Sequence, residues 1–471
     1  MMRRASLALA LAAVALGGCS TLSAVGDKIP FIGNKKNSTT ATAGQRVAVI
    51  AFDEKLATAE GLKGADFQLP DPVDRADWPL PGGTPEQTVE NVAAAPAFQI
   101  AWKRDFGKAS KRASQVTAPP IAAGGKIFVM DGEATVSAID AASGDIVWKR
   151  DLRPEAGRVG KRLLGIGFGG KGDRTGFGGG VAYSDGKIYV ASGFRFVSQL
   201  DAATGRVGWT TPVQSPLHSA PTVADGRVFA MSIENELLTF DTATGAAGWT
   251  YQALIEPARI LRASSPAVSG DTIVAGFGSG ELVALRAGNG NELWTEALSR
   301  ANRNNALSEI RDIAGRPAIY RGDVFAVSHS GVLSATDLRT GQTRWTLPII
   351  GITSPLPAGD VVFVVSKAGE VICASRENGQ IYWIRELNPT AGLKKRQLKR
   401  LSKHPVLWST PILANGRLIL TSSNGRLLAL NAKTGETQHE LKLGGPGLMG
   451  PIAVGGKVFI ATDEAQLVAL R

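Results

Sequence analysis

Residues 138–148 read AIDAASGDIVW, in which an apolar strand end leads into a polar turn, a glycine and, four residues later, a tryptophan. The same order returns along the chain with the same spacing between glycine and tryptophan. The pairs are Gly144 and Trp148, Gly205 and Trp209, Gly245 and Trp249, Gly290 and Trp294, Gly341 and Trp345, and Gly379 and Trp383. A seventh copy carries Gly435 but has His439 in place of the tryptophan. This recurrence indicates a repeat protein built from similar supersecondary units.

A second glycine marks a turn before an apolar strand in each unit. It recurs at Gly125, Gly186, Gly226, Gly270, Gly322, Gly359, Gly416 and Gly456. These glycines are 61, 40, 44, 52, 37, 57 and 40 residues apart, so the basic unit is near 40 residues and the longer gaps carry insertions. Residues 126–130 and 417–421 are apolar runs typical of strands buried on both faces. Eight such units predict a β-propeller.

The two ends of the repeat region complement each other. The eighth unit stops at 467–471, before a tryptophan strand, whereas an orphan strand at 98–102 precedes the first unit. Pairing them would complete one blade and remove exposed strand edges, which invite aggregation. The sequence therefore predicts an all-β fold, an eight-bladed β-propeller of four-stranded blades over residues 97–471, closed by the N-terminal strand.

A chain that begins at residue 106 should then aggregate, whereas one that begins near residue 90 should stay soluble.

The composition is that of a globular protein, with 44% hydrophobic and 20% charged residues. It excludes wholesale disorder and a membrane protein with many spans. The formal net charge is +11, and +9 without Arg3 and Arg4. This charge is spread thinly and has no interleaved aromatic residues to stack bases, so no nucleic-acid partner is expected. With Cys19 and Cys373 as its two cysteines, the chain has no disulfide framework or cysteine-based zinc site.

The N-terminus has the pattern of an export signal. Residues 1–4 form a positively charged segment through Arg3 and Arg4. They precede an apolar run, 5–16, which is shorter than the ~20 residues of a membrane-spanning helix. The run ends in Leu16-Gly17-Gly18-Cys19, which resembles the lipobox of bacterial lipoproteins. The alternative is an ordinary signal peptide that contains a cysteine.

The lipobox resemblance implies that the signal peptide, residues 1–18, is removed and that Cys19 carries the lipid. By the same resemblance Ser20, rather than an aspartate, implies the outer membrane. Residues 19–96 would form the lipidated tether and an N-terminal extension, and whether residues 45–96 fold stays open. Several acyl chains anchor a protein stably without a transmembrane helix.

Other suggestive motifs favour structural roles. Residues 165–171 nearly match a phosphate-binding loop, but Gly172 stands where a serine or threonine must hold magnesium, so a glycine-rich loop is expected. The basic stretch at 394–403 is expected to be a solvated loop, with lipid headgroups or an acidic partner as the alternative. The histidines His218, His329, His404 and His439 lack metal-ligand spacing. No catalytic residue, metal or cofactor is expected.

The repeat A-L-[DN]-x-x-T-G-x-x-x-W resembles that of pyrroloquinoline-quinone (PQQ) propellers over residues 97–471. Quinoprotein dehydrogenases and the BamB family, lipoproteins of the outer-membrane β-barrel assembly (Bam) complex, share this repeat. The lipobox, the eight units and the segment Asp77–Gly83 resemble BamB proteins of alphaproteobacteria. The resemblance implies a non-catalytic scaffold at the periplasmic face of the outer membrane. Its expected partners are the periplasmic domains of BamA, the other Bam subunits and nascent outer-membrane proteins.

The same resemblance implies a partner-binding site. The family has an L-x-L-R segment before a blade start, and here Leu261 and Arg262 match it while Arg259 replaces the first leucine. An acidic D-x-D loop one unit later keeps its first acid, Asp312. Leu261 and Arg262 are expected to anchor BamA, and Asp312 would add mainly to the association rate if it lies at the wet rim.

Three alternatives stay open. The segments that hold Leu261, Arg262 and Asp312 could be loops without a binding role. The chain could be a PQQ- and calcium-dependent dehydrogenase, or a propeller that binds a ligand in its channel without catalysis. Quinoprotein dehydrogenases typically carry an adjacent cysteine pair near the cofactor, which Cys19 and Cys373 do not form.

Overall fold

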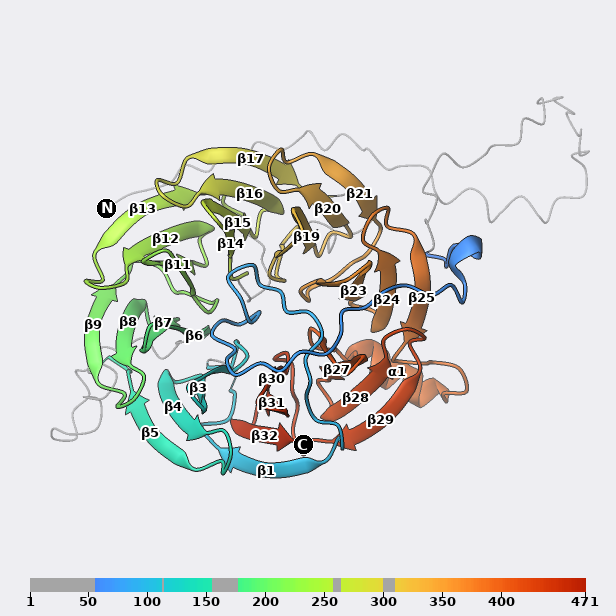
Figure 1. Ribbon diagram of the computed structural model, residues 1–471, viewed down its shortest axis with the longest axis horizontal. Coiled ribbons are helices and arrows are strands. Elements are labelled where there is room, and N and C mark those ends of the chain that lie inside the picture. The colour runs from blue at the N-terminus through green and yellow to red at the C-terminus, as the bar shows by residue number, and fades with distance from the viewer. Residues whose placement is uncertain (1–55, 112–113, 155–176, 257–263, 300–309) are drawn as a thin grey trace, which may run out of the picture. The chain divides into compact units, whose positions relative to one another are not determined.

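Eight four-stranded antiparallel sheets follow one another along the chain and form the blades of a ring (Figure 1). The structure is a computed structural model that describes residues 56–111, 114–154, 177–256, 264–299 and 310–471. The described residues belong to one compact unit, Lys55–Arg471. The prediction of an eight-bladed β-propeller is confirmed.

In each blade the strands run in order from the axis of the ring to its outer edge. Blades 1 and 2 are β2 (Ile121–Ala123), β3 (Lys126–Met130), β4 (Thr135–Asp140) and β5 (Ile146–Asp151), then β6 (Gly179–Ser184), β7 (Lys187–Ser192), β8 (Phe196–Asp201) and β9 (Val207–Pro212). Blades 3 and 4 are β10 (Thr222–Ala224), β11 (Arg227–Met231), β12 (Glu236–Asp241) and β13 (Ala247–Gln252), then β14 (Ala267–Ser269), β15 (Thr272–Gly276), β16 (Glu281–Arg286) and β17 (Glu292–Ala297).

Blades 5 and 6 are β18 (Ala318–Tyr320), β19 (Asp323–Val327), β20 (Leu333–Asp337) and β21 (Thr343–Leu347), then β22 (Leu356–Ala358), β23 (Val361–Val365), β24 (Glu370–Ser375) and β25 (Ile381–Glu386). Blade 7 is β26 (Ile412–Ala414), β27 (Arg417–Thr421), β28 (Arg426–Asn431) and β29 (Thr437–Lys442). Blade 8 is β30 (Ile452–Val454), β31 (Lys457–Ala461), β32 (Gln466–Leu470) and β1 (Ile100–Asp105).

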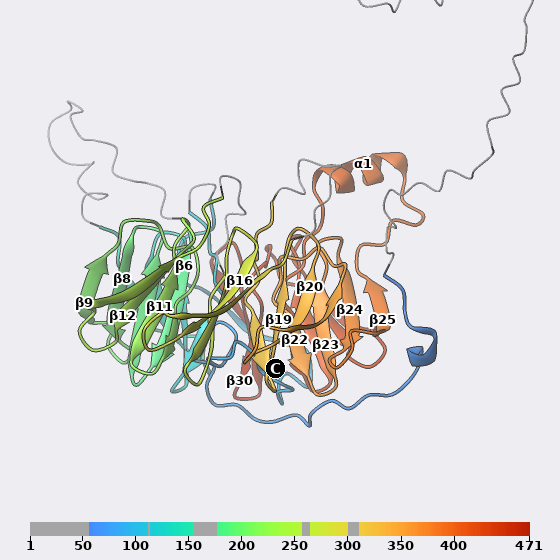
Figure 2. The ribbon, with the colours of Figure 1, turned by 90° about the horizontal axis from the view of Figure 1, so that it is seen from above.

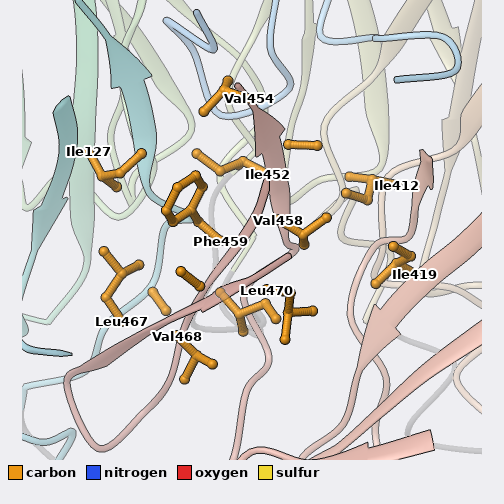
Figure 3. Close-up of a cluster of buried hydrophobic side chains, with 14 of the residues drawn as sticks. Ile127, Ile412, Ile419, Ile452, Val454, Val458, Phe459, Leu467, Val468 and Leu470 are labelled. Atoms are coloured by element: carbon orange, nitrogen blue, oxygen red, sulfur yellow. The ribbon is translucent and has the colours of Figure 1, made fainter. Parts of the chain in front are cut away.

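Blade 8 closes the ring as the sequence predicts. Strand β1 pairs antiparallel with β32, with Trp102 opposite Ala469 and Asp105 opposite Gln466. The strand begins at Ile100 rather than at Phe98, because Phe98 has a positive φ of 48° and turns the chain into the strand. Apolar side chains of blades 7, 8 and 1 pack together beside this joint (Figure 3).

The tryptophan of each repeat packs against the glycine of the next blade. A Cβ added to Gly205 would lie 2.6 Å from the Trp148 ring, and one added to Gly245 would lie 2.5 Å from the Trp209 ring. The Trp148 indole also donates to the Ala202 carbonyl of that next blade at 3.1 Å. The repeated glycine and tryptophan therefore form an interlocking contact between adjacent blades.

This packing explains why the seventh copy carries His439 instead of tryptophan. The next blade is blade 8, whose two outer strands, β32 and β1, come from opposite ends of the chain and share no glycine turn. His439 instead stacks on Phe98, with the ring centroids 5.3 Å apart.

Residues 66–95, termed the strap, cross one face of the ring (the blue chain at the centre of Figure 1). Backbone hydrogen bonds join the strap to blades 1, 2, 4, 5, 6, 7 and 8, and Gln87 donates to Thr222 of blade 3 at 3.0 Å. The blade residues with these backbone bonds are Ala122, Tyr183, Val268, Ile319, Asp360, Leu413, Asn415, Gly455 and Gly456. The strap is thus part of the folded unit and connects every blade.

In the described ranges, two short helices lie outside the blades, the 3-10 helix η2 (Glu60–Leu62) and α1 (Lys395–Lys403). Helix α1 occupies the basic stretch that was expected to be a loop, and it has no buried residue. Within the described residues, no helix is long and apolar enough to cross a membrane.

Candidate partner-binding face

The connections between blades leave from one face of the ring, termed the connection face. The four strands of a blade alternate in direction. The turn between the first and second strands therefore lies on one face of the ring, and the chain leaves the fourth, outer strand at the opposite face. The strap contacts the ring near those inner turns, so it lies on the other face. Helix α1 connects blades 6 and 7, and Figure 2 shows it opposite the strap.

The structure does not test the predicted anchors directly. Leu261, Arg262 and the proposed lipid site Cys19 all lie outside the described residues. The chain reaches the segment that holds Leu261 from the end of β13 and leaves it toward β14. The three assignments therefore stay predictions.

An exposed apolar pair lies directly before that segment. The side chains of Leu254 and Ile255 are 67% and 76% exposed. The backbone beneath Leu254 is fixed, because its N–H donates to Glu281 Oε2 at 3.0 Å and its carbonyl accepts from Asn235 Nδ2 at 2.5 Å. Apolar side chains that are held in solvent on a rigid backbone are suited to binding a partner.

Leu254 and Ile255 are not among the residues predicted from the sequence. A signal was present in the sequence, because this apolar dipeptide lies in the connection between blades 3 and 4, beyond the end of the repeat pattern. The core of the ring does not require apolar residues there. A further exposed apolar side chain, Ile350, lies in the connection between blades 5 and 6.

Asp312 does not lie at a wet rim. Its side chain is 1% exposed, and its carbonyl accepts a hydrogen bond from the His329 N–H at 2.9 Å. A direct contact between this carboxylate and a partner does not fit such burial. Asp312 instead lies in the connection before blade 5. Its backbone carbonyl holds that connection to His329, which lies in the turn between β19 and β20.

His329 contacts both the connection before blade 5 and the neighbouring blade 6. Its Nδ1 lies 3.3 Å from the Ile310 carbonyl and its Nε2 lies 2.7 Å from Lys367 Nζ. Burial and the charge of Lys367 lower the pKa of His329 below its ordinary value of 6.5.

A pH dependence of stability follows from His329. Because its pKa is lower in the folded chain than in the unfolded chain, the unfolded chain takes up the proton first as the pH falls. The free energy of unfolding should therefore decrease from pH 6.5 down to the folded-state pKa of His329. Urea unfolding at several pH values should show a weaker decrease in His329→Gln. The same pH dependence in both proteins would contradict this role.

The turn aspartates of the repeat have a structural role. Asp241 Oδ1 accepts from the Thr244 N–H and hydroxyl at 2.8 and 2.7 Å, and these bonds lower the pKa of Asp241. Cys373 is buried, which raises the pKa of its thiol. Within the described residues, no three His, Cys, Asp or Glu side chains are grouped to hold a metal ion.

Comparison with known proteins identifies the family. A family model described as "Outer membrane protein assembly factor BamB" matches residues 86–161, 160–385 and 392–471. The chain belongs to the BamB family. BamB of Escherichia coli K12 is 30% identical over 352 residues, which cover 74% of this chain and 83% of that protein. BamB of Shewanella oneidensis is 24% identical and covers 82% of this chain and 92% of that protein.

Solved structures agree on the fold. BamB of Moraxella catarrhalis has a TM-score of 0.61 at 17% identity and covers 79% of this chain and 99% of its own. The quinohemoprotein alcohol dehydrogenase of Comamonas testosteroni has the same TM-score at 15% identity and covers 82% of this chain and 76% of its own. The shared propeller therefore does not separate BamB from the dehydrogenases, whereas the sequence comparison does.

Proposed function

We propose that this protein is a non-catalytic scaffold of the outer-membrane β-barrel assembly complex. It binds the periplasmic domains of BamA and aids the insertion of nascent outer-membrane proteins. The observation that carries the proposal is the BamB family match, which extends over nearly the whole ring.

The connection face supplies a suitable surface for this role. Leu254 and Ile255 present exposed apolar side chains a few residues before Leu261 and Arg262 in the sequence, the residues that match the family's partner-binding segment. An apolar anchor beside an arginine is a common makeup of an interface hot spot, because the guanidinium binds carboxylates or carbonyls at the edge of a dry contact. Asp312 is buried in the connection before blade 5 and would position that connection rather than contact the partner.

The direct test is co-purification from detergent-solubilised envelopes. The tagged protein should retain BamA and further Bam subunits, which mass spectrometry would identify. An unrelated outer-membrane lipoprotein with the same tag serves as the control. Recovery of the protein without any Bam subunit in excess of that control would overturn the proposal.

A PQQ-dependent dehydrogenase is the second candidate, because the fold is also that of the quinohemoprotein alcohol dehydrogenase. Addition of PQQ and calcium to the purified protein distinguishes the two functions. A scaffold should show neither a bound-quinone absorbance nor alcohol oxidation. Either signal in stoichiometric amount would support the enzyme.

The proposed location is the periplasmic face of the outer membrane, with a lipid on Cys19 as the anchor. Cys19→Ala should release the protein from the membrane pellet into the soluble fraction, because no acyl chain would remain to hold it. Cys373→Ala is the matched control and should leave the distribution unchanged. Wild-type amounts of Cys19→Ala in the outer-membrane fraction would contradict the anchor.

A further inference from the structure

The axis of the ring is lined by an equivalent position from successive blades. This position precedes the proline that leads into the inner strand, and blade 2 lacks the proline. The residues are Pro119, Ala220, Ser265, Arg316, Ser354, Thr410 and Gly450, and all of them line a central cavity of about 60 Å³. Arg316 is the one charged or large side chain in this set.

Packing alone does not require an arginine there. Ser265, Ser354 and Thr410 fill the equivalent places in blades 4, 6 and 7 with small polar side chains. In blade 2 the axis is tighter still, since a Cβ on Gly180 would lie 2.6 Å from the Ala220 Cβ. The repeat thus tolerates small residues at the axis, and Arg316 breaks the pattern.

The Arg316 side chain lacks a counterion among the described residues. Its backbone N–H donates to Ser354 Oγ at 2.9 Å, but its Nε is buried and has no hydrogen-bond partner in the described part of the chain. Burial lowers the pKa of Arg316 to about 10, with no acidic group to offset it. Arg316 as a whole is partly buried, and a desolvated cation without a partner is costly unless an anion or other acceptors satisfy it.

Further unpartnered polar atoms gather around the same axis. The Ser219 hydroxyl lines the central cavity, is buried and finds no hydrogen-bond partner among the residues that the structure describes. Among the same residues, Trp78 Nε1 and Thr88 Oγ1 of the strap are also buried without partners, and they line a cavity of about 30 Å³ that shares Arg316 with the first. Most of these groups are hydrogen-bond donors, so their arrangement favours an acceptor-rich, negatively charged ligand.

We propose that the central cavity binds a small oxyanion of the phosphate or carboxylate class on Arg316, with the Ser219 hydroxyl as a second donor. A water needs roughly 10–15 Å³ of such space, so the cavity has room for an ion of a few heavy atoms. Arginine is well suited to this ligand because its planar guanidinium donates paired hydrogen bonds to oxyanions. The strap closes the ring on the side of Trp78.

The test compares wild type with Arg316→Ser, which introduces the residue of blades 4 and 6. Arg339→Ser, in an exposed turn, is the matched control for the loss of one positive charge. Thermal unfolding and titration calorimetry of the full-length mature protein are measured in phosphate, acetate and chloride at equal ionic strength. Phosphate or acetate should raise the melting temperature of wild type and Arg339→Ser above its value in chloride.

Arg316→Ser should bind the oxyanion at least tenfold more weakly and, without it, melt no lower than wild type, because the uncompensated charge is gone. Equal responses of Arg316→Ser and wild type, or no effect beyond chloride, would overturn the proposal in favour of ordered water.

A direct measurement covers the case in which Arg316→Ser fails to fold. In crystals of the wild type soaked in selenate, anomalous diffraction should place selenium within hydrogen-bond reach of the guanidinium. A cavity that shows no selenium would refute the site. BamA binding is expected to be unchanged in all variants, so this test and that of the scaffold function can fail independently.

Discussion

A chain that begins at residue 97, without the strap, should lose most of its thermal stability although all eight blades remain complete. The strap contributes hydrogen bonds to every blade and the buried apolar side chains Phe67, Trp78, Leu80, Val89 and Val92. Burial of one large apolar side chain contributes about 1.5–3 kcal/mol. Five of them together reach the ~5–15 kcal/mol by which a typical domain is stable.

The experiment compares chains that begin at residues 55, 90, 97 and 106 by circular dichroism and sedimentation. The chain from 55 should melt cooperatively and stay monomeric. The chain from 90 was expected from sequence to be soluble, but it lacks Trp78 and Leu80, so we now expect it to melt far lower. The chain from 106 also lacks β1 and should aggregate through the open edge of β32. Equal melting temperatures for the chains from 55 and 97 would show that the strap is dispensable.

Leu261→Ala combined with Arg262→Ala should abolish co-purification of BamA without lowering the melting temperature. Loss of an interface anchor costs about 2 kcal/mol or more, which is roughly a thirtyfold loss of affinity. Leu254→Ala combined with Ile255→Ala should also weaken binding, because both side chains are exposed on the proposed face. Because exposed side chains contribute little to folding, this variant should melt as the wild type does.

The control is Ile146→Ala combined with Val147→Ala, an exposed apolar pair on outer strand β5. Affinity is measured with purified BamA periplasmic domains, and stability by thermal unfolding. The control should bind as the wild type does. A Leu261 and Arg262 double variant that melts normally and binds with unchanged affinity would eliminate the site. A lowered melting temperature would instead indicate that these side chains brace the blade.

The sequence by itself determined the blades, their number and their closure. These features follow from local periodicity, because each unit places its own glycine turn, apolar strands and tryptophan at fixed spacing. The lock of Trp148 on Gly205 spans only adjacent repeats, so its pattern is visible along the chain. The orphan strand that contains Trp102 and the unfinished unit that ends in Leu470 likewise indicated their own pairing.

The tertiary structure alone decided the features that depend on residues far apart in sequence. The strap has no repeat pattern, and its bonds join residues such as Asn91 and Gly416 that are 325 positions apart. The burial of Asp312 depends on how the connection before blade 5 folds against His329. The isolation of Arg316 appears only when the eight blades meet at the axis, because desolvation is a property of the closed ring and not of any one repeat.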